Sequence, residues 1–216
     1  MTSADPAADP AALTPPPDES EWVLSYLGVR LSVGVLGAAL PVLLFVSRFF
    51  FGDHRLPPSI SAFYYTPMRN VLVGTLCAQG VFLFSYRYAR RDNWLSTLAA
   101  ILVVIVALSP TAAPGAPDTF WTIAHGVAAG GFYLVLAYFS YFLFTRSDAP
   151  VEPGSPKALR NSIYRVCGVL VVLAMAVALA LLRSPVHLLF WCETVASLAF
   201  SFAWLVKGGL LFADQP

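Results

Sequence analysis

The sequence predicts an all-α integral membrane protein, a bundle of six transmembrane helices. Three observations predict it: 58% of the 216 residues are hydrophobic, only 12% are charged, and the mean hydropathy is +0.71. A soluble domain is about 45–50% apolar and about 25% charged. A chain with so few charges lacks the polar coat of a water-soluble globule. Its net charge of +1 also gives no general attraction to nucleic acid.

Six apolar runs are long enough to cross a bilayer, which takes about 20 residues for a hydrocarbon core about 30 Å thick. The last two runs are joined by three residues, so we expect a tight helical hairpin there. The predicted spans are about 27–50, 70–86, 94–113, 120–144, 164–182 and 186–206.

The regions outside the spans are short or polar. Residues 1–22 form an acidic, Pro- and Ala-rich segment without Lys or Arg, which predicts a disordered tail rather than a secretory signal. Residues 23–212 form a single six-helix transmembrane domain. Residues 146–162, RSDAPVEPGSPKALRNS, are typical of a polar linker. Pro41 and Pro110 are expected to kink the first and third helices.

Basic residues near the spans predict the orientation. With six helices, the side that carries both termini holds nine of these Lys and Arg residues and the opposite side holds four. Cytoplasmic flanks carry the excess of basic residues. We therefore expect a multi-pass protein of the cell membrane with both termini in the cytoplasm.

Small residues and cysteines give packing predictions. Gly34 and Gly37 lie close together in the first helix, and Gly126 and Gly130 are four apart in the fourth. This spacing lets helices approach closely, either within the monomer or between two copies in a homo-oligomer. The three cysteines lie inside apolar runs and have no CxxC spacing, so we expect free thiols and no disulfide framework.

Ionisable residues gather toward the side predicted to face outward. His54, His125 and His187 all lie there, and Glu193 is the acidic residue well inside a span. A charged group at the centre of a bilayer costs about 2.5–3.5 kcal/mol on insertion scales unless it finds a partner or water. Glu193 should therefore face the bundle, on a polar stripe continued by residues 197 and 201.

The segment SISAFYYTPMRN, residues 59–70, precedes the second span. Thr66 followed by Pro67 predicts a helix start with a threonine cap. Arg69 in the first turn opposes the helix dipole, so we expect an anionic partner for it, either Glu193 or a ligand. The predicted outward-facing pocket is lined by Ser59, Ser61, Tyr64, Tyr65, Arg69, His125 and Glu193.

Several functions fit such a pocket. The leading prediction is a non-enzymatic protein that binds a lipid or small solute, with membrane lipids as partners and no cofactor. The alternative is a membrane-embedded hydrolase with zinc held by His54, His125, His187 and Glu193, although no HxxxH or HExxH pair is present. Serine hydrolysis would need Ser59 or Ser61 beside a histidine. A small-solute transporter is the third possibility, and a purely structural polar network is the fourth.

Five stretches resemble a family of uncharacterised bacterial six-helix integral membrane proteins: SISAFYYTPMRNVLVGTL, GVFLFSYRY, IAHGVAAGGFYLVLAYFSYFLF, RNSIYRVCG and FWCETVASLAFSFAWLVKGG. The chain is more distantly similar to the Frag/DRAM/Sfk group of six-helix membrane proteins. That wider group is linked with membrane lipid organisation and trafficking, so the resemblance implies a lipid-related role by analogy.

Overall fold

The computed structural model describes residues 19–51, 54–86, 93–113, 115–147, 150–180, 188–210 and 212, with side chains from residue 27 onward. Within them the chain is all-helical and has no strand, which confirms the predicted fold class. A short 3₁₀ helix, η2, precedes α2, and a π-helical turn, η3, continues α4. The elements are α1 (Glu19–Ser47), η2 (Ser61–Tyr65), α2 (Arg69–Ser85), α3 (Asn93–Leu108), α4 (Phe120–Tyr138), η3 (Phe139–Leu143), α5 (Pro156–Ala180) and α6 (Leu189–Lys207).

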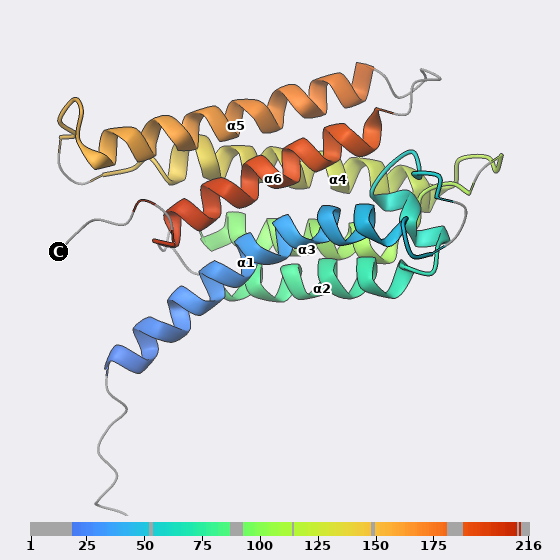
Figure 1. The fold of residues 1–216 in the computed structure, drawn as a ribbon, viewed down its shortest axis with the longest axis horizontal. Helices are drawn as coiled ribbons and strands as arrows, with labels where there is room; N and C mark the ends of the chain where they lie inside the picture. Colours follow the sequence, from blue (N-terminus) through green and yellow to red (C-terminus); the bar gives the residue numbers. More distant parts are fainter. Residues whose placement is uncertain are drawn as a thin grey trace, which may run out of the picture.

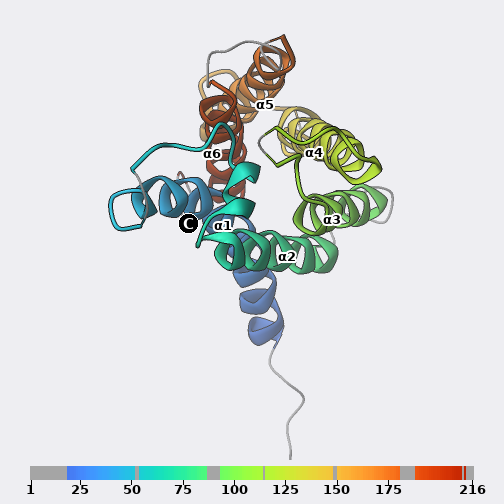
Figure 2. The ribbon, with the colours of Figure 1, turned by 90° about the vertical axis from the view of Figure 1, so that its right-hand side faces the viewer.

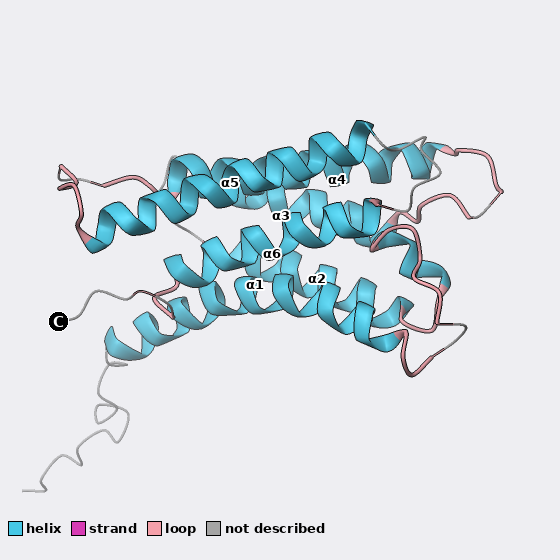
Figure 3. Cartoon of the chain, turned by 45° about the horizontal axis from the view of Figure 1, so that its top comes forward, coloured by secondary structure: helices cyan, strands magenta, loops and turns pink. Residues whose placement is uncertain are grey.

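Consecutive α-helices run in opposite directions along the bundle (Figure 1). Each helix packs against its neighbour in sequence, and α6 packs against α1, so the helices form a closed ring (Figure 2). The loops lie at the two ends of the bundle (Figure 3). We name these ends after the short helices they carry, the η2 end and the η3 end. The start of α1 and the end of α6 both lie at the η3 end (Figure 1).

Four helical segments are long and apolar enough to cross a membrane: Leu27–Ser47, Phe120–Leu143, Pro156–Ala180 and Leu189–Lys207. The helix α3 is apolar but has 16 residues, which corresponds to about 24 Å at 1.5 Å per residue. The helix α2 has 17 residues. The multi-pass membrane class follows from the four long segments, and crossing by α2 and α3 remains a prediction.

Several helix boundaries differ from the sequence prediction. The third span was expected to reach residue 113 with a kink at Pro110, but α3 ends at Leu108. Proline disfavours the helical conformation of the residue before it, so the helix stops ahead of Pro110. In contrast, α5 begins at Pro156, inside the expected linker. The Ser155 Oγ accepts a hydrogen bond from the Ala158 N–H at 3.2 Å, and proline suits the first helical position.

The first helix also begins early. It starts at Glu19, inside the segment expected to be the tail, and Pro41 lies within it. The rest of the expected tail, residues 1–18, lies outside the described residues.

The helices α1 and α6 pack closely along their seam. A Cβ added to Gly34 would lie 2.7 Å from the Leu205 Cδ2, and one added to Gly37 would lie 2.5 Å from the Ser201 Oγ. Real Cβ atoms do not come this close, so a side chain at either position would have to displace the side chain of Leu205 or Ser201. The prediction that these glycines mark a close helix contact is confirmed within the monomer.

A cluster of aromatic side chains fills the interior of the helix bundle at the η3 end. Trp204 of α6 is fully buried, and its ring centroid lies 4.9–5.5 Å from four other aromatic rings. Such pairs add about 0.5–1.5 kcal/mol each beyond their burial of apolar area. The four rings belong to Tyr86, Phe139, Phe144 and Phe200.

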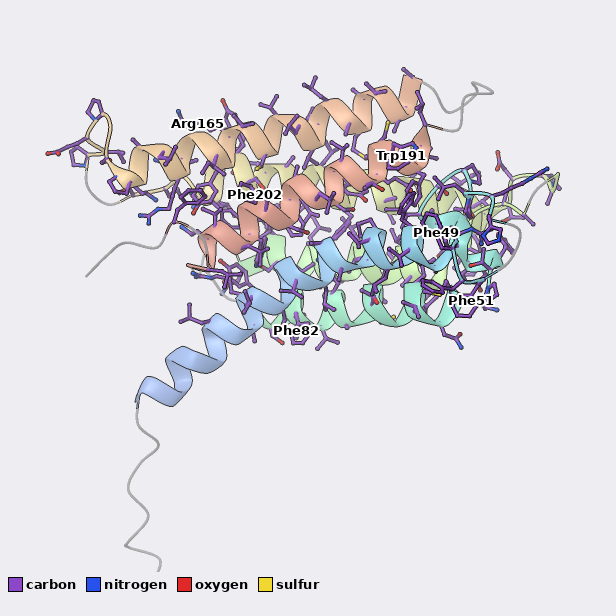
Figure 4. All side chains as sticks on the ribbon, in the orientation of Figure 1. Phe49, Phe51, Phe82, Arg165, Trp191 and Phe202 are labelled. Carbon is purple, nitrogen blue, oxygen red and sulfur yellow. The ribbon has the colours of Figure 1, made fainter. Side chains whose placement is uncertain are left out.

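The outside of the ring is apolar. Val127 on α4 and Leu179 on α5 are each 71% exposed. Phe49 and Trp191 are exposed toward the η2 end, and Phe202 is exposed further along α6 (Figure 4). A surface that exposes so many large apolar side chains is suited to contact with lipid rather than with water. The three cysteines are free, as predicted.

Candidate functional site

The segment before α2 folds into the η2 end of the ring. Ile60 and Phe63 are buried against α1, α2 and α6, in a cluster with Leu44, Leu72 and Phe190. The Phe190 N–H donates to the Pro58 carbonyl at 2.9 Å, which ties this segment to the first turn of α6. The alternation of polar and apolar residues in SISAF therefore has a physical role: the apolar residues anchor the segment, and the serines remain for polar contacts.

Glu193 lies in the second turn of α6 and faces the bundle, as predicted. Its Oε2 accepts a hydrogen bond from the Ile60 N–H at 2.5 Å. Its Oε1 accepts none from the described part of the chain. One carboxylate oxygen thus holds the buried segment in place, and the other is available to accept a hydrogen bond from a ligand or water.

His125 lies in the second turn of α4 and has partners on both ring nitrogens. Nδ1 is 2.6 Å from the Ser109 carbonyl oxygen, and Nε2 is 2.9 Å from the Ser61 Oγ. A carbonyl oxygen can only accept, so in the neutral ring Nδ1 carries the proton. Nε2 then accepts from the Ser61 hydroxyl. His125 therefore connects the end of α3 to the segment that carries Ser61.

A cavity of about 770 Å³ lies next to these residues. It runs between α4 and α5, and we call it the α4–α5 groove. Its polar lining lies toward the η2 end and is formed by Ser59, Ser61, Thr111, Asp118, Thr122, His125, Tyr133 and Glu193. Its apolar walls are formed by Ile123, Val127 and Leu134 of α4 and by Val172, Met175 and Leu179 of α5.

Glycines determine where the groove is open and where it closes. A Cβ added to Gly126 or Gly130 would meet nothing within 4 Å, and both residues line the groove. In contrast, a Cβ on Gly168 of α5 would lie 3.0 Å from the Tyr141 Cβ and 3.1 Å from the Ala137 carbonyl oxygen. The two helices thus touch near η3 and separate toward the η2 end. Gly126 and Gly130, expected to mark close packing, leave space inside the monomer instead.

A second, smaller cavity lies on the axis of the ring. Its volume is about 60 Å³, large enough to hold water, and Gln79, Tyr133, Glu193 and Ser197 contribute its polar lining. The Tyr133 hydroxyl is 2.9 Å from the Ser197 Oγ. Glu193 and Ser61 line both this cavity and the groove. The predicted polar stripe on α6 therefore faces the interior of the ring.

The structure brings together four of the seven predicted pocket residues: Ser59, Ser61, His125 and Glu193 all line the groove. Tyr65 lies elsewhere, where its hydroxyl donates to the Thr111 carbonyl at 2.6 Å and its side chain lines a separate surface pocket of about 600 Å³.

The expected pair between Arg69 and Glu193 does not form. The Arg69 guanidinium donates to the Tyr64 hydroxyl at 2.5 Å and lies 4.1 Å from the centroid of the same ring. A cation over an aromatic face is itself a stabilising partner. Tyr64 and Arg69 are therefore each other's hydrogen-bond and cation–π partners, and both lie outside the groove.

Thr66 is not the cap of α2. The helix begins at Arg69, and its cap residue, Met68, makes no side-chain capping hydrogen bond. The Thr66 Oγ1 instead accepts from the Met68 N–H at 3.2 Å, which stabilises the turn just before the helix.

The described residues do not form a metal centre: no three His, Cys, Asp or Glu side chains among them gather closely enough to hold an ion. His54 is bonded through Nδ1 to the Arg48 carbonyl at 2.7 Å, and His125 is held by Ser61 and Ser109. His187, another of the expected ligands, lies outside the described residues.

Sequence reasoning missed Tyr133, Thr122 and the α5 wall of the groove. A signal for Tyr133 was present, because it follows His125 by eight residues and so lies on the same face of a helix. The α5 residues gave no such signal. They are ordinary aliphatic side chains, and only the separation of α4 from α5 makes them a wall.

The fold and this site define the class: a helical, multi-pass membrane protein with an interior polar site and a groove between two of its helices. Comparison with protein-family models, with curated proteins and with solved structures gives no match for this chain.

Proposed function

We propose that this protein binds a lipid or an amphipathic small molecule in the α4–α5 groove. The proposal rests on one observation: a single cavity of about 770 Å³ has a polar end and two aliphatic walls. An amphipathic ligand likewise has a polar group at one end and a hydrocarbon chain. Its polar group would lie beside Ser61, His125 and Glu193, and its hydrocarbon chain would lie between α4 and α5.

The surroundings of the groove support a ligand that comes from the bilayer. Val127 and Leu179, which line it, are among the most exposed apolar side chains of the protein. In a membrane such side chains face lipid tails, so a chain can enter sideways between α4 and α5. The resemblance to the Frag/DRAM/Sfk group, with its link to membrane lipids, adds an analogy in the same direction.

Filling the groove provides the test. Gly130→Leu adds a side chain where a Cβ meets nothing within 4 Å, so it should fill the groove without disturbing the packing. We expect wild-type protein purified in mild detergent to retain a lipid that native mass spectrometry detects, and Gly130→Leu to lose it.

The matched control is Gly74→Leu on α2, where a Cβ likewise meets nothing within 4 Å and which does not line the groove. Its bound lipid should be unchanged. Equal retention of the same lipid by both variants would contradict binding in the groove.

A specific observation favours a second candidate, a serine hydrolase. The Ser61 Oγ lies 2.9 Å from His125 Nε2, and the Ser109 carbonyl holds Nδ1, which gives a nucleophile and an oriented base at the polar end of the groove. Ser61 would attack an ester carbonyl while its proton passes to His125. The alcohol would leave with that proton, and water would then hydrolyse the acyl-serine.

A fluorophosphonate probe tests this candidate, because an activated serine attacks its phosphorus and expels fluoride. We expect an adduct on Ser61 that is absent in Ser61→Ala and in His125→Gln and is retained in the control Ser59→Ala. If the folded wild-type protein shows no adduct at Ser61, the hydrolase candidate fails, and the binding proposal is unaffected.

A further inference from the structure

The groove selects its ligand by charge and by hydrogen-bonding type. We propose, on the basis of the binding function above, that the ligand is a long-chain amine whose cationic head lies beside Glu193 and whose hydrocarbon chain follows α4 and α5. Three features of the described residues carry this proposal: the charges of the lining, its free hydrogen-bonding groups and the path of the apolar walls.

The charges in the lining are of one sign. Among the described residues that line the groove, Asp118 and Glu193 are acidic, and none is Lys or Arg. The described basic residues at the same end lie elsewhere: Arg69 is over the Tyr64 ring, while Arg48 and Arg55 line the separate surface pocket. Among the described residues of the lining, an anionic head group would therefore meet carboxylates without a compensating cation, whereas a cationic head group has Glu193 as its partner.

The hydrogen-bond donors of the site are mostly taken. The Ile60 N–H is given to Glu193, the Ser61 hydroxyl to His125, and the proton on His125 Nδ1 to the Ser109 carbonyl. The groups left for a ligand are the Glu193 Oε1 and the lone pairs of the Ser61 Oγ, which only accept, and the Ser59 and Thr111 hydroxyls, which can accept as well as donate. An ammonium group carries three donors and no acceptor, so it matches this set.

The apolar walls give the chain a continuous path. From His125 to Leu134 along α4 is nine residues, or about 13–14 Å, close to the half-thickness of a hydrocarbon core of about 30 Å. A further cavity of about 510 Å³ shares Leu134 and Val172 with the groove and continues to Tyr141 and Gly168. A ligand with its head at Glu193 can therefore lay its chain along the same seam.

A matched series of amphiphiles tests the charge preference. Hexadecylamine, hexadecanol and hexadecanoate have chains of the same length and differ in the head group. We expect the amine to displace the co-purified lipid from full-length protein in nanodiscs at a concentration about tenfold lower than the alcohol does, since a charge-assisted hydrogen bond is stronger than a neutral one. Hexadecanoate should be the weakest of the three.

Glu193→Gln should remove the preference for the amine, so that hexadecylamine and hexadecanol displace the lipid at similar concentrations. Because Glu193 also holds the Ile60 N–H, Asp118→Asn provides a second variant at an exposed residue; it should reduce amine binding by a smaller factor.

The outcomes separate the two proposals. Equal binding of all three amphiphiles, or tightest binding of hexadecanoate, overturns the amine preference while groove binding stands. If none of the three binds and Gly130→Leu retains the co-purified lipid, both proposals fail.

Discussion

A few single residues determine the shape of the site. Gly168 lets α5 touch η3, where the Tyr141 Cβ would be 3.0 Å from an added Cβ. Gly126 and Gly130 leave the groove open further along α4. Glu193 and His125 then hold the segment from Ile60 to Ser61 across its polar end. Small residues thus have opposite consequences in the two helices, contact in one and space in the other.

The contact at Gly168 gives a prediction for stability. Gly168→Ala would push its Cβ against the backbone at Ala137 and Tyr141, and overpacking of this kind costs about 1–3 kcal/mol. We expect a lower midpoint of thermal unfolding in detergent, measured by the loss of helical circular dichroism or by intrinsic fluorescence. Gly74→Ala, where nothing lies within 4 Å, should leave the midpoint unchanged or slightly raised. Equal midpoints for the two variants would mean that α5 and η3 are not in close contact.

At the scale of the elements, the helices themselves could be predicted from the apolar runs, because each run is long and unbroken. The errors lie where local chemistry competes with hydropathy. Pro110 ends α3 early, and the Ser155–Pro156 pair starts α5 within a stretch that looks like a linker. The partner of Arg69 was also mispredicted. An aromatic ring five residues earlier in the chain satisfies it, and hydropathy carries no information about such a contact.

At the scale of the whole molecule, the closed ring explains why a polar site can exist in so apolar a chain. The helix α6 packs against both α5 and α1, so the Glu193–Ser197 stripe faces inward and not toward lipid. All described loops between consecutive helices alternate between the two ends (Figures 1 and 3). The excess of basic residues at the end with the termini predicts that the η3 end is cytoplasmic and the η2 end faces outward.

This orientation can be measured with single cysteines added to a variant that lacks the three native ones. Ala116 lies in the exposed loop at the η2 end, and Glu152 lies in the exposed loop at the η3 end. We expect a membrane-impermeant maleimide to label Ala116→Cys in intact cells and Glu152→Cys only after the cells are permeabilised. Labelling of Glu152→Cys in intact cells would reverse the predicted orientation. Labelling of both in intact cells would indicate that α4, the helix between the two positions, does not cross the membrane.

The class of protein, the six helices, the free cysteines and the inward-facing Glu193 could all be predicted from the amino-acid sequence. These follow from hydropathy and from the high cost of a charge in hydrocarbon, which act on each segment separately. Which polar residues meet, in contrast, depends on the packing of the whole chain. Ser61, His125 and Glu193 come from three distant parts of the chain, and α4 separates from α5 because close contact occurs at Gly168 and not at Gly126 or Gly130. Such separations depend on how whole helices pack, so no local pattern encodes the groove.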